Sequence, residues 1–335
     1  MEVFYENVFS NGIIQEIDYL LEDNFQMFYI QDLGDEYTDR YVYPYDSIKY
    51  RLDNELVLLY DKFRDLIFPD TETYYQELNS LPIWVQHAGQ NSDCSITSNQ
   101  FSELIQECSE NIPNLLRHLY LVDCQFLVGT IQNLLSDMEY AFVNYFINIS
   151  RASKRSEPID DDTILCEISW NSRCISGLLE NYFIKAYSIL DILCKICHEF
   201  QNPQTDFSSY KKMNSSEMLW GSRKKLRING SKETLFEDNT LIRSIEALRN
   251  EAIHNGTWEL NPKIYYRFEN GSVAEHYMLF PDIDQGHLST TKNRRHFFGE
   301  ETKVNDVLPV IHLTYQNLLM NTIAMLNEAD INSSM

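Results

Sequence analysis

The sequence has little positive charge and no long apolar run. Only 27 of its 335 residues are Lys or Arg, against 50 Asp and Glu, and its formal net charge is −23. It contains no stretch of about eighteen apolar residues, so we expect no transmembrane helix. The amino terminus has acidic residues where a signal peptide has basic ones, so we expect a cytoplasmic protein. A hydrophobic fraction of 44% still allows a globular core.

Cysteines are also few, and their number, seven, is odd. Most lie within apolar helical patterns, which favours reduced, buried thiols over disulfides. Cys194, Cys197 and His198 have the Cys-x-x-Cys-His spacing of haem attachment, but they lie inside the apolar run 187–200. No second Cys/His pair has a spacing suited to zinc. We therefore predict no cofactor and no metal.

The negative charge is concentrated in the first half of the chain. Residues 1–150 contain 25 acidic and 6 basic residues, whereas 151–335 contain 25 acidic and 21 basic residues. Because an acidic surface repels phosphate, a nucleic acid would have to approach the carboxy-terminal half. Residues 211–250 are locally positive, with nine basic and five acidic residues. The acidic half is either a solvated surface or a binding region for a basic partner.

Apolar residues recur mainly with helical spacing. They predict helices around 12–28, 48–68, 99–109, 113–150, 163–200, 239–254 and 304–327, with 113–150 either one helix or two broken near Gly129. An alternating pattern around Asn270-Gly271 predicts a small β-hairpin insertion near 262–281. The polar segment 151–162 is the best candidate boundary. We therefore predict an all-α fold, with an acidic, mostly helical region over 1–155 and a helical bundle domain over 156–335.

The most informative stretch runs from residue 245 to residue 255. Arg249, Asn250 and His254 supply a fixed cation, a polar positioner and a group that exchanges a proton near neutral pH. RNA carries its own nucleophile, the 2′-hydroxyl, so cleavage needs a base, an acid and positive charge on the phosphorane. We predict that His254 is the acid/base, that Arg249 binds the phosphate and that Asn250 orients the His or the phosphate. Such cleavage needs no metal and yields a 2′,3′-cyclic phosphate and a 5′-hydroxyl. The alternative is an exposed Arg and a helix-end His without catalytic roles.

Helical spacing places a condition on this motif. On a regular α-helix, Arg249 and His254 lie about 140° apart, so one helix would not aim both at the same phosphate. The conflict is eased if His254 lies at the helix end beside Asn255-Gly256, or if a second copy of the helix faces the first across a dimer. Asp238 or Asn239 is a plausible cap for the start of this helix. The motif therefore predicts a homodimer as well as an enzyme.

Two basic clusters are candidate RNA contacts. One consists of Arg223, Lys224, Lys225 and Arg227 in a polar segment before the motif helix. The other, Arg294 and Arg295 beside Lys292 and His296, follows the predicted hairpin. The alternative for both clusters is a solvated loop.

Residues 248–256, which read Leu-Arg-Asn-Glu-Ala-Ile-His-Asn-Gly, resemble the motif of the HEPN superfamily. Ribonucleases of that superfamily carry Arg-x4–6-His, often with a polar residue after the Arg. The resemblance covers at most residues 160–330. It implies a bundle of antiparallel helices, usually dimeric with the two motifs meeting at the interface. It also implies metal-independent RNA cleavage by a toxin–antitoxin or antiviral defence effector.

The resemblance has two further consequences. In the toxin branch that is silenced by nucleotidylation, a Tyr stands two residues after the His, whereas this chain has Gly256 there, so we do not expect that form of control. A regulatory protein or antitoxin would instead bind the acidic amino-terminal region. The competing hypothesis is a non-catalytic, HEPN-like sensor or scaffold that binds a protein or nucleotide partner.

Overall fold

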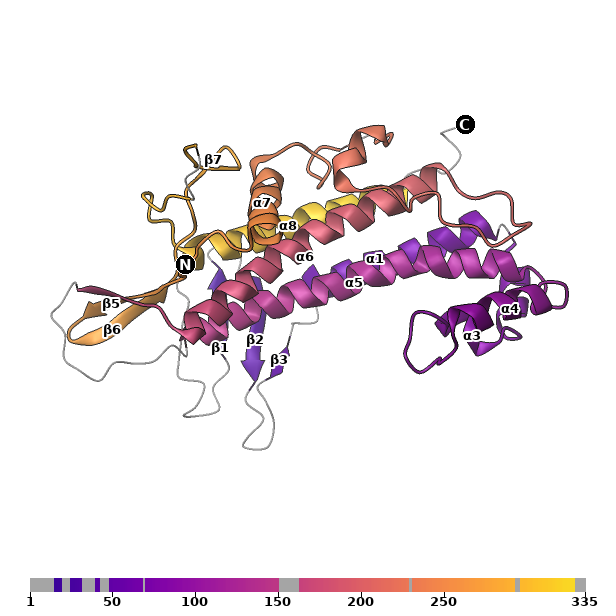
Figure 1. Ribbon diagram of the computed structural model, residues 1–335, viewed down its shortest axis with the longest axis horizontal. Helices are drawn as coiled ribbons and strands as arrows, with labels where there is room; N and C mark the ends of the chain where they lie inside the picture. Colours follow the sequence, from indigo (N-terminus) through magenta and orange to yellow (C-terminus); the bar gives the residue numbers. More distant parts are fainter. Residues whose placement is uncertain are drawn as a thin grey trace. The chain divides into compact units, whose positions relative to one another are not determined.

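Most of the described chain is helical (Figure 1). The computed structural model describes residues 15–19, 25–31, 40–42, 48–68, 70–150, 163–228, 231–292 and 296–328. The α-helices are α1 (Ile48–Ile67), α2 (Thr71–Leu78), α3 (Ile83–His87), α4 (Ser98–Cys108), α5 (Leu115–Ser150), α6 (Trp170–Gln201), α7 (Thr240–Asn250) and α8 (Val304–Glu328). The prediction of a mainly helical fold is confirmed.

Small antiparallel sheets accompany the helices. The first sheet consists of β1 (Gln15–Tyr19), β2 (Phe25–Gln31) and β3 (Arg40–Val42). The second consists of β4 (Ile164–Glu167), β5 (Ile264–Glu269) and β6 (Ser272–Tyr277). The third is the pair β7 (Ile283–Asp284) and β8 (His287–Leu288). Asn270 and Gly271 join β5 to β6 with φ angles of +50° and +70°, as a type I′ turn requires. The predicted hairpin is therefore confirmed, and β4 extends it to a third strand.

Two of the predicted helices are wrong in part. Residues 12–28 contain β1 and the start of β2, which pair antiparallel. Short runs rich in Ile, Tyr and Phe fit either periodicity, and pairing between the two runs favours strands. The helix predicted from residue 163 begins only at Trp170, because β4 pairs with β5. Ser169 and Ser172 cap its start, each accepting a hydrogen bond from the other's backbone N–H at 3.2 and 3.0 Å.

The chain divides into two compact units that interleave along the sequence. The first unit combines Met1–Asp53, Leu135–Tyr187 and Lys232–Asn321, and the second combines Asn54–Leu134, Ser188–Ser231 and Thr322–Met335. Each unit takes residues from both sides of the predicted boundary at 155. We describe each by itself.

Aromatic side chains from α5, α6 and α8 form the core of the first unit. The ring of His312 stacks on Phe142 with centroids 4.2 Å apart, and its Nδ1 lies 3.2 Å from the hydroxyl of Tyr182. The Tyr315 hydroxyl donates to the carbonyl of Ala186 at 2.7 Å. Each of these side chains is at most 1% exposed. Burial of each aromatic ring stabilises the fold by about 1.5–3 kcal/mol.

A buried carboxylate organises part of the second unit. Glu199, on α6, accepts hydrogen bonds from the hydroxyl of Tyr120 at 2.5 Å and from the backbone N–H of Ser215 at 2.7 Å. These bonds tie the segment after α6 to α5, because a buried carboxylate without donors would be strongly destabilising. Helix α5 passes through Gly129 without a break, so it is one helix. A Cβ at Gly129 would lie 3.1 Å from the hydroxyl of Tyr60.

No helix within the described ranges is both long enough and apolar enough to span a lipid bilayer.

Candidate active site

Helix α7 carries the motif and is anchored in the first unit. The side chain of Asn239 caps its start by accepting a hydrogen bond from the backbone N–H of Ile242 at 3.0 Å. Asp238, the other candidate cap, instead lies 3.4 Å from the Nε of Arg243. The apolar face of α7, formed by Ile242, Ile245 and Leu248, is buried. This face fixes α7 and therefore the position of Arg249, the next residue after Leu248.

The turn that carries His254 is a π-helix rather than a continuation of the α-helix. Helix α7 ends at Asn250, and the π turn η2 spans Glu251–Asn255. Gly256 ends it in the left-handed conformation, with φ of +84°, as expected for an Asn-Gly stop. A π turn bonds each residue to the one five positions on, so residues five apart lie closer to one face than on an α-helix. The wider turn therefore reduces the angle between Arg249 and His254 within a single chain.

The guanidinium of Arg249 is held in place without being neutralised. One of its terminal nitrogens donates to Oδ1 of Asn250 at 2.9 Å, and its central carbon lies 4.7 Å from the ring centroid of Tyr187. Among the described residues, no carboxylate forms an ion pair with it. Arg249 therefore presents an oriented positive charge that can bind an anion. Asn250 contacts the Arg in this arrangement, not the His.

The His254 side chain is exposed, and within the described parts of the chain neither ring nitrogen has a hydrogen-bond partner. Both ring nitrogens are therefore open to a substrate. The motif thus combines a held cation with an accessible imidazole.

A second histidine lies beside the motif. The Nε2 of His296 is 3.2 Å from Oε2 of Glu251, which also accepts a hydrogen bond from the side chain of Asn255 at 2.8 Å. The His296 side chain is only 4% exposed, and its Nδ1 has no partner in the described structure. Glu251 therefore links the motif turn to a segment more than forty residues further along the chain. Local sequence patterns carry no signal for this long-range contact.

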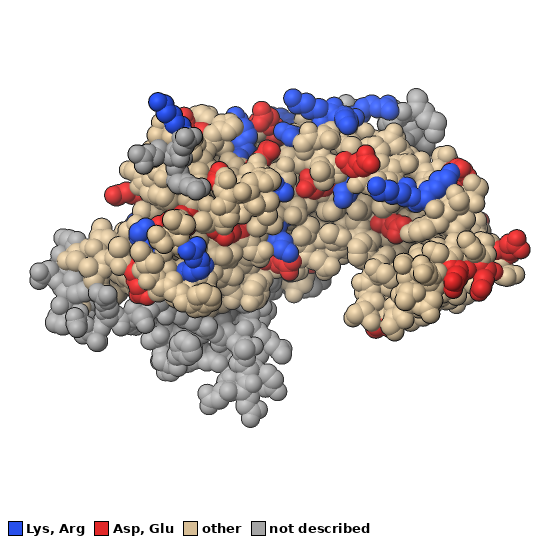
Figure 2. Space-filling model, in the orientation of Figure 1, with Lys and Arg blue, Asp and Glu red and all other residues tan. Residues whose placement is uncertain are grey.

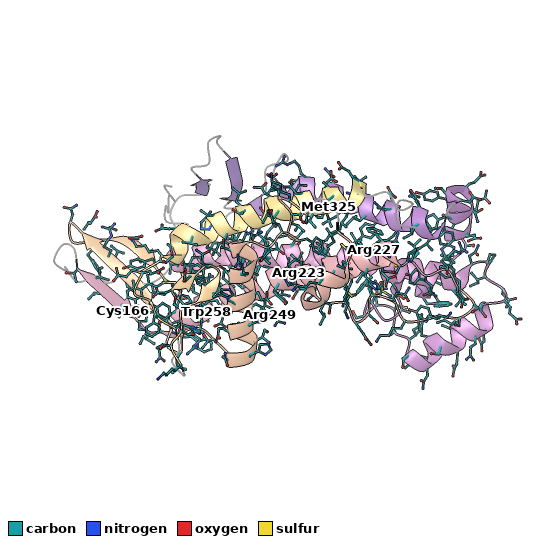
Figure 3. The ribbon with its side chains drawn as sticks, turned by 90° about the horizontal axis from the view of Figure 1, so that it is seen from above. Cys166, Arg223, Arg227, Arg249, Trp258 and Met325 are labelled. Carbon is teal, nitrogen blue, oxygen red and sulfur yellow. The ribbon has the colours of Figure 1, made fainter. Side chains whose placement is uncertain are left out.

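The chain that follows the motif is also anchored. Trp258, which is labelled in Figure 3, is buried. Its ring meets that of Phe183 edge-on, with centroids 6.0 Å apart. Burial raises the pKa of the Glu180 carboxyl, whereas a hydrogen bond from Thr257 lowers it. Anchors on both sides of Gly256 fix the end of the π turn.

Of the predicted RNA-contact residues, four belong to the second unit and two lie outside the described residues. Arg223, Lys224 and Lys225 lie on the 3-10 helix η1 (Trp220–Lys225), which belongs to the second unit, as does Arg227. The guanidinium of Arg223 lies 4.4 Å from the ring of Trp220, whereas Lys224 and Lys225 are exposed. Figure 2 shows Lys and Arg side chains along the stretch 202–228. Arg294 and Arg295 lie outside the described residues.

The cysteines differ in their environment. Cys194 and Cys197 are buried, and burial raises the pKa of both thiols, to about 12 for Cys194. The prediction of buried thiols is confirmed for this pair and for Cys124. It is wrong for Cys166 and Cys174, which are exposed, because the first lies on an edge strand and the second on the first turns of α6. In the described ranges, no group of three or more His, Cys, Asp or Glu side chains is arranged to hold a metal ion.

Comparisons of this chain with protein-family models, curated proteins and solved structures found no significant match. A held guanidinium at the end of α7, and an imidazole on η2 without a hydrogen-bond partner in the described chain, suit the binding of a phosphate and the transfer of a proton beside it.

Proposed function

We propose that this chain is a metal-independent endoribonuclease that cleaves RNA at the 2′-hydroxyl. The observation that carries the proposal is the π turn, because its wider winding reduces the angle between Arg249, at the end of α7, and His254, on η2. Asn250 holds Arg249, and among the described residues Arg249 forms no ion pair and His254 has no hydrogen-bond partner. Arg and His are the two residue types that this reaction needs, a fixed positive charge and a proton carrier at neutral pH.

The proposed reaction proceeds without an external nucleophile. Neutral His254 removes the proton from the 2′-hydroxyl, whose oxygen then bonds to the adjacent phosphorus. Arg249 binds the phosphate oxygens as negative charge develops on the phosphorane. The bond from phosphorus to the 5′-oxygen breaks, and protonated His254 returns the proton to that oxygen. The products are a 2′,3′-cyclic phosphate and a 5′-hydroxyl, and His254 is neutral again.

The proposal also covers the assembly, the cellular role and the control of the enzyme. The enzyme is a cytoplasmic homodimer of the HEPN type, acting as a toxin or antiviral defence effector. A regulatory protein or antitoxin binds the acidic amino-terminal region, since a nuclease in the cytoplasm needs restraint. The exposed Lys224 and Lys225, with Arg223 and Arg227, stay predicted contacts to the RNA backbone.

The test is RNA cleavage by the purified chain in excess chelator. We expect cleavage by the wild type, and a rate lower by about 100-fold or more in Arg249→Ala and in His254→Ala. The matched controls are Arg243→Ala, which alters another Arg of α7, and His287→Ala, which removes an exposed His of β8 in the same unit. Cleavage that survives both motif substitutions, or that the chelator abolishes, contradicts the mechanism.

A further inference from the structure

A pocket of about 410 Å³ opens within the second unit. Residues of α5 and α6 and of the segment 210–216 line it. Its volume falls within the range of about 300–1,000 Å³ that is typical of small-molecule sites. None of the residues that line it belongs to the motif on α7, so the proposed cleavage does not use this pocket.

Three lysines line this pocket: Lys195 on α6, and Lys211 and Lys212 on the segment that follows α6. Lys211 forms an ion pair with Asp206. Neither Lys195 nor Lys212 forms an ion pair within the described chain. In a protein with a net charge of −23, two unpaired lysines at one depression provide a local site for an anion.

The pocket also holds polar groups that are already fixed or that lack a partner. The hydroxyl of Tyr210 donates to Oδ2 of Asp123 at 2.7 Å, and burial raises the pKa of that carboxyl. Ser215 is 1% exposed, and its hydroxyl has no hydrogen-bond partner among the described residues. Because protein atoms enclose the Ser215 oxygen, the lysine ammonium groups are the donors that an anion in this pocket can reach.

Apolar surface accompanies these polar groups. Leu127 and Met213 line the same pocket, and the ring of Tyr210 adds a flat face. The Tyr210 ring is itself fixed from two sides, by the bond to Asp123 and by edge-on contact with Phe101 at 6.0 Å between centroids. A ligand that suits this lining therefore has an anionic end and a flat, largely apolar body.

We propose that this pocket binds a phosphomonoester that carries a flat, aromatic body. Lys195 and Lys212 bind the phosphate. The body lies against Tyr210, Leu127 and Met213. Phosphate is favoured over carboxylate because its additional charge and oxygens match two separate ammonium groups.

The experiment is a titration of the full chain by isothermal calorimetry. The probes are AMP, glucose 6-phosphate and inorganic phosphate. We expect AMP to bind with one site per chain and at least about tenfold more tightly than the other two, since only AMP has an aromatic body that can lie against Tyr210. Binding of inorganic phosphate or glucose 6-phosphate as tight as that of AMP would overturn the assignment of the aromatic body, and no heat of binding with any probe would overturn the site.

Substitutions locate the binding. Lys195→Ala and Lys212→Ala should each weaken AMP binding by about tenfold, as expected for loss of one hydrogen bond to a charged group. Lys224→Ala removes an exposed lysine of the same unit that does not line the pocket, and should leave binding unchanged. Arg249→Ala should also leave it unchanged, which separates this site from the proposed cleavage site. If Lys224→Ala weakened AMP binding as much as the pocket variants do, or if Arg249→Ala weakened it at all, the assignment to this pocket would be overturned.

Discussion

At the scale of single residues, Asn250 positions Arg249 through one hydrogen bond of 2.9 Å. We expect Asn250→Ala to lower the RNA cleavage rate by about tenfold, because the guanidinium loses the partner that holds it. Asn250→Asp should lower the rate further, since a carboxylate neutralises Arg249 and repels phosphate. Rates of single-turnover cleavage measure both effects. Asn255→Ala is the control, because Asn255 bonds to Glu251 and not to Arg249, and an unchanged rate in Asn250→Ala would contradict the role of Asn250.

His312 makes stability depend on pH. Burial lowers its pKa to about 3 in the folded protein, against 6.5 when unfolded. Between these values the unfolded chain binds a proton that the folded chain does not, so stability is lost as the pH falls below 6.5. The slope from one such group is about 1.4 kcal/mol per pH unit.

Urea unfolding between about pH 7 and pH 5 measures this slope. We expect a shallower fall of the unfolding free energy in His312→Gln than in the wild type. His118, whose pKa burial also lowers, contributes in the same direction to both proteins and cancels in the comparison. His287→Gln, at an exposed position, serves as the control. Parallel pH profiles of His312→Gln and the wild type would show that His312 does not cause the loss.

At the scale of elements, the start of α7 depends on one cap. Asn239 bonds to the backbone of Ile242, whereas Asp238 is exposed and only near Arg243. We therefore expect Asn239→Ala to lower the free energy of unfolding by about 1 kcal/mol. Asp238→Ala should change it by less than about 0.5 kcal/mol. Urea midpoints of the two variants compare them directly, and equal destabilisation would show that both residues cap the helix.

The turn between β7 and β8 is packed against α7 at a glycine. A Cβ at Gly286 would lie 2.6 Å from the Cβ of Arg243 and 2.7 Å from the carbonyl oxygen of Thr240. Gly286→Ala should therefore lower the unfolding free energy by about 1–3 kcal/mol more than Gly256→Ala. Gly256 is the matched control, because its φ of +84° resembles the +86° of Gly286 but nothing lies within 4 Å of its Cβ position. Thermal unfolding measures both, and equal shifts would mean that the close approach can relax without cost.

Elements whose signals are local could be predicted from the sequence. The cap at Asn239, the stop at Gly256 and the turn at Asn270-Gly271 each depend on a few neighbouring residues. Strand β4 could not be predicted, because its residues become a strand only by pairing with β5, about a hundred residues further on. The π form of the turn at Glu251–Asn255 could not be predicted from the local sequence either, because its anchors, such as Trp258 and the Glu251–His296 pair, come from tertiary contacts.

At the scale of the whole molecule, the candidate site combines residues that the local sequence predicts with residues that only long-range contacts bring in. Arg249, Asn250 and His254 are adjacent in sequence and form one recognisable pattern. Tyr187, which holds Arg249, and His296, which bonds to Glu251, come from α6 and from the segment before α8. The two units interleave because helices α1, α5, α6 and α8 each contribute residues to both, which a boundary placed at a polar segment does not reveal.

The π turn also bears on whether a second copy of the chain must contribute Arg249 or His254 to each active site. On a regular α-helix, Arg249 of one copy and His254 of another would have to meet across an interface. Because the π turn brings the two residues closer to one face of the same chain, we expect each copy to carry its own complete site. Light scattering of the purified chain tests the proposed dimer. Mixing Arg249→Ala with His254→Ala under conditions that exchange subunits tests how the site is composed.

We expect the mixture to stay as inactive as either variant, because every chain in it lacks one of the two residues. If the site were shared between copies, half of the dimers would be mixed and each would contain one intact site, restoring about a quarter of the wild-type rate. Wild-type chains carrying two different affinity tags, mixed under the same conditions, are the control for exchange, because co-purification of the two tags reports mixed dimers directly. Recovery in the mixture of variants would place Arg249 and His254 on opposite sides of an interface, and the π turn would then serve to aim His254 at the partner.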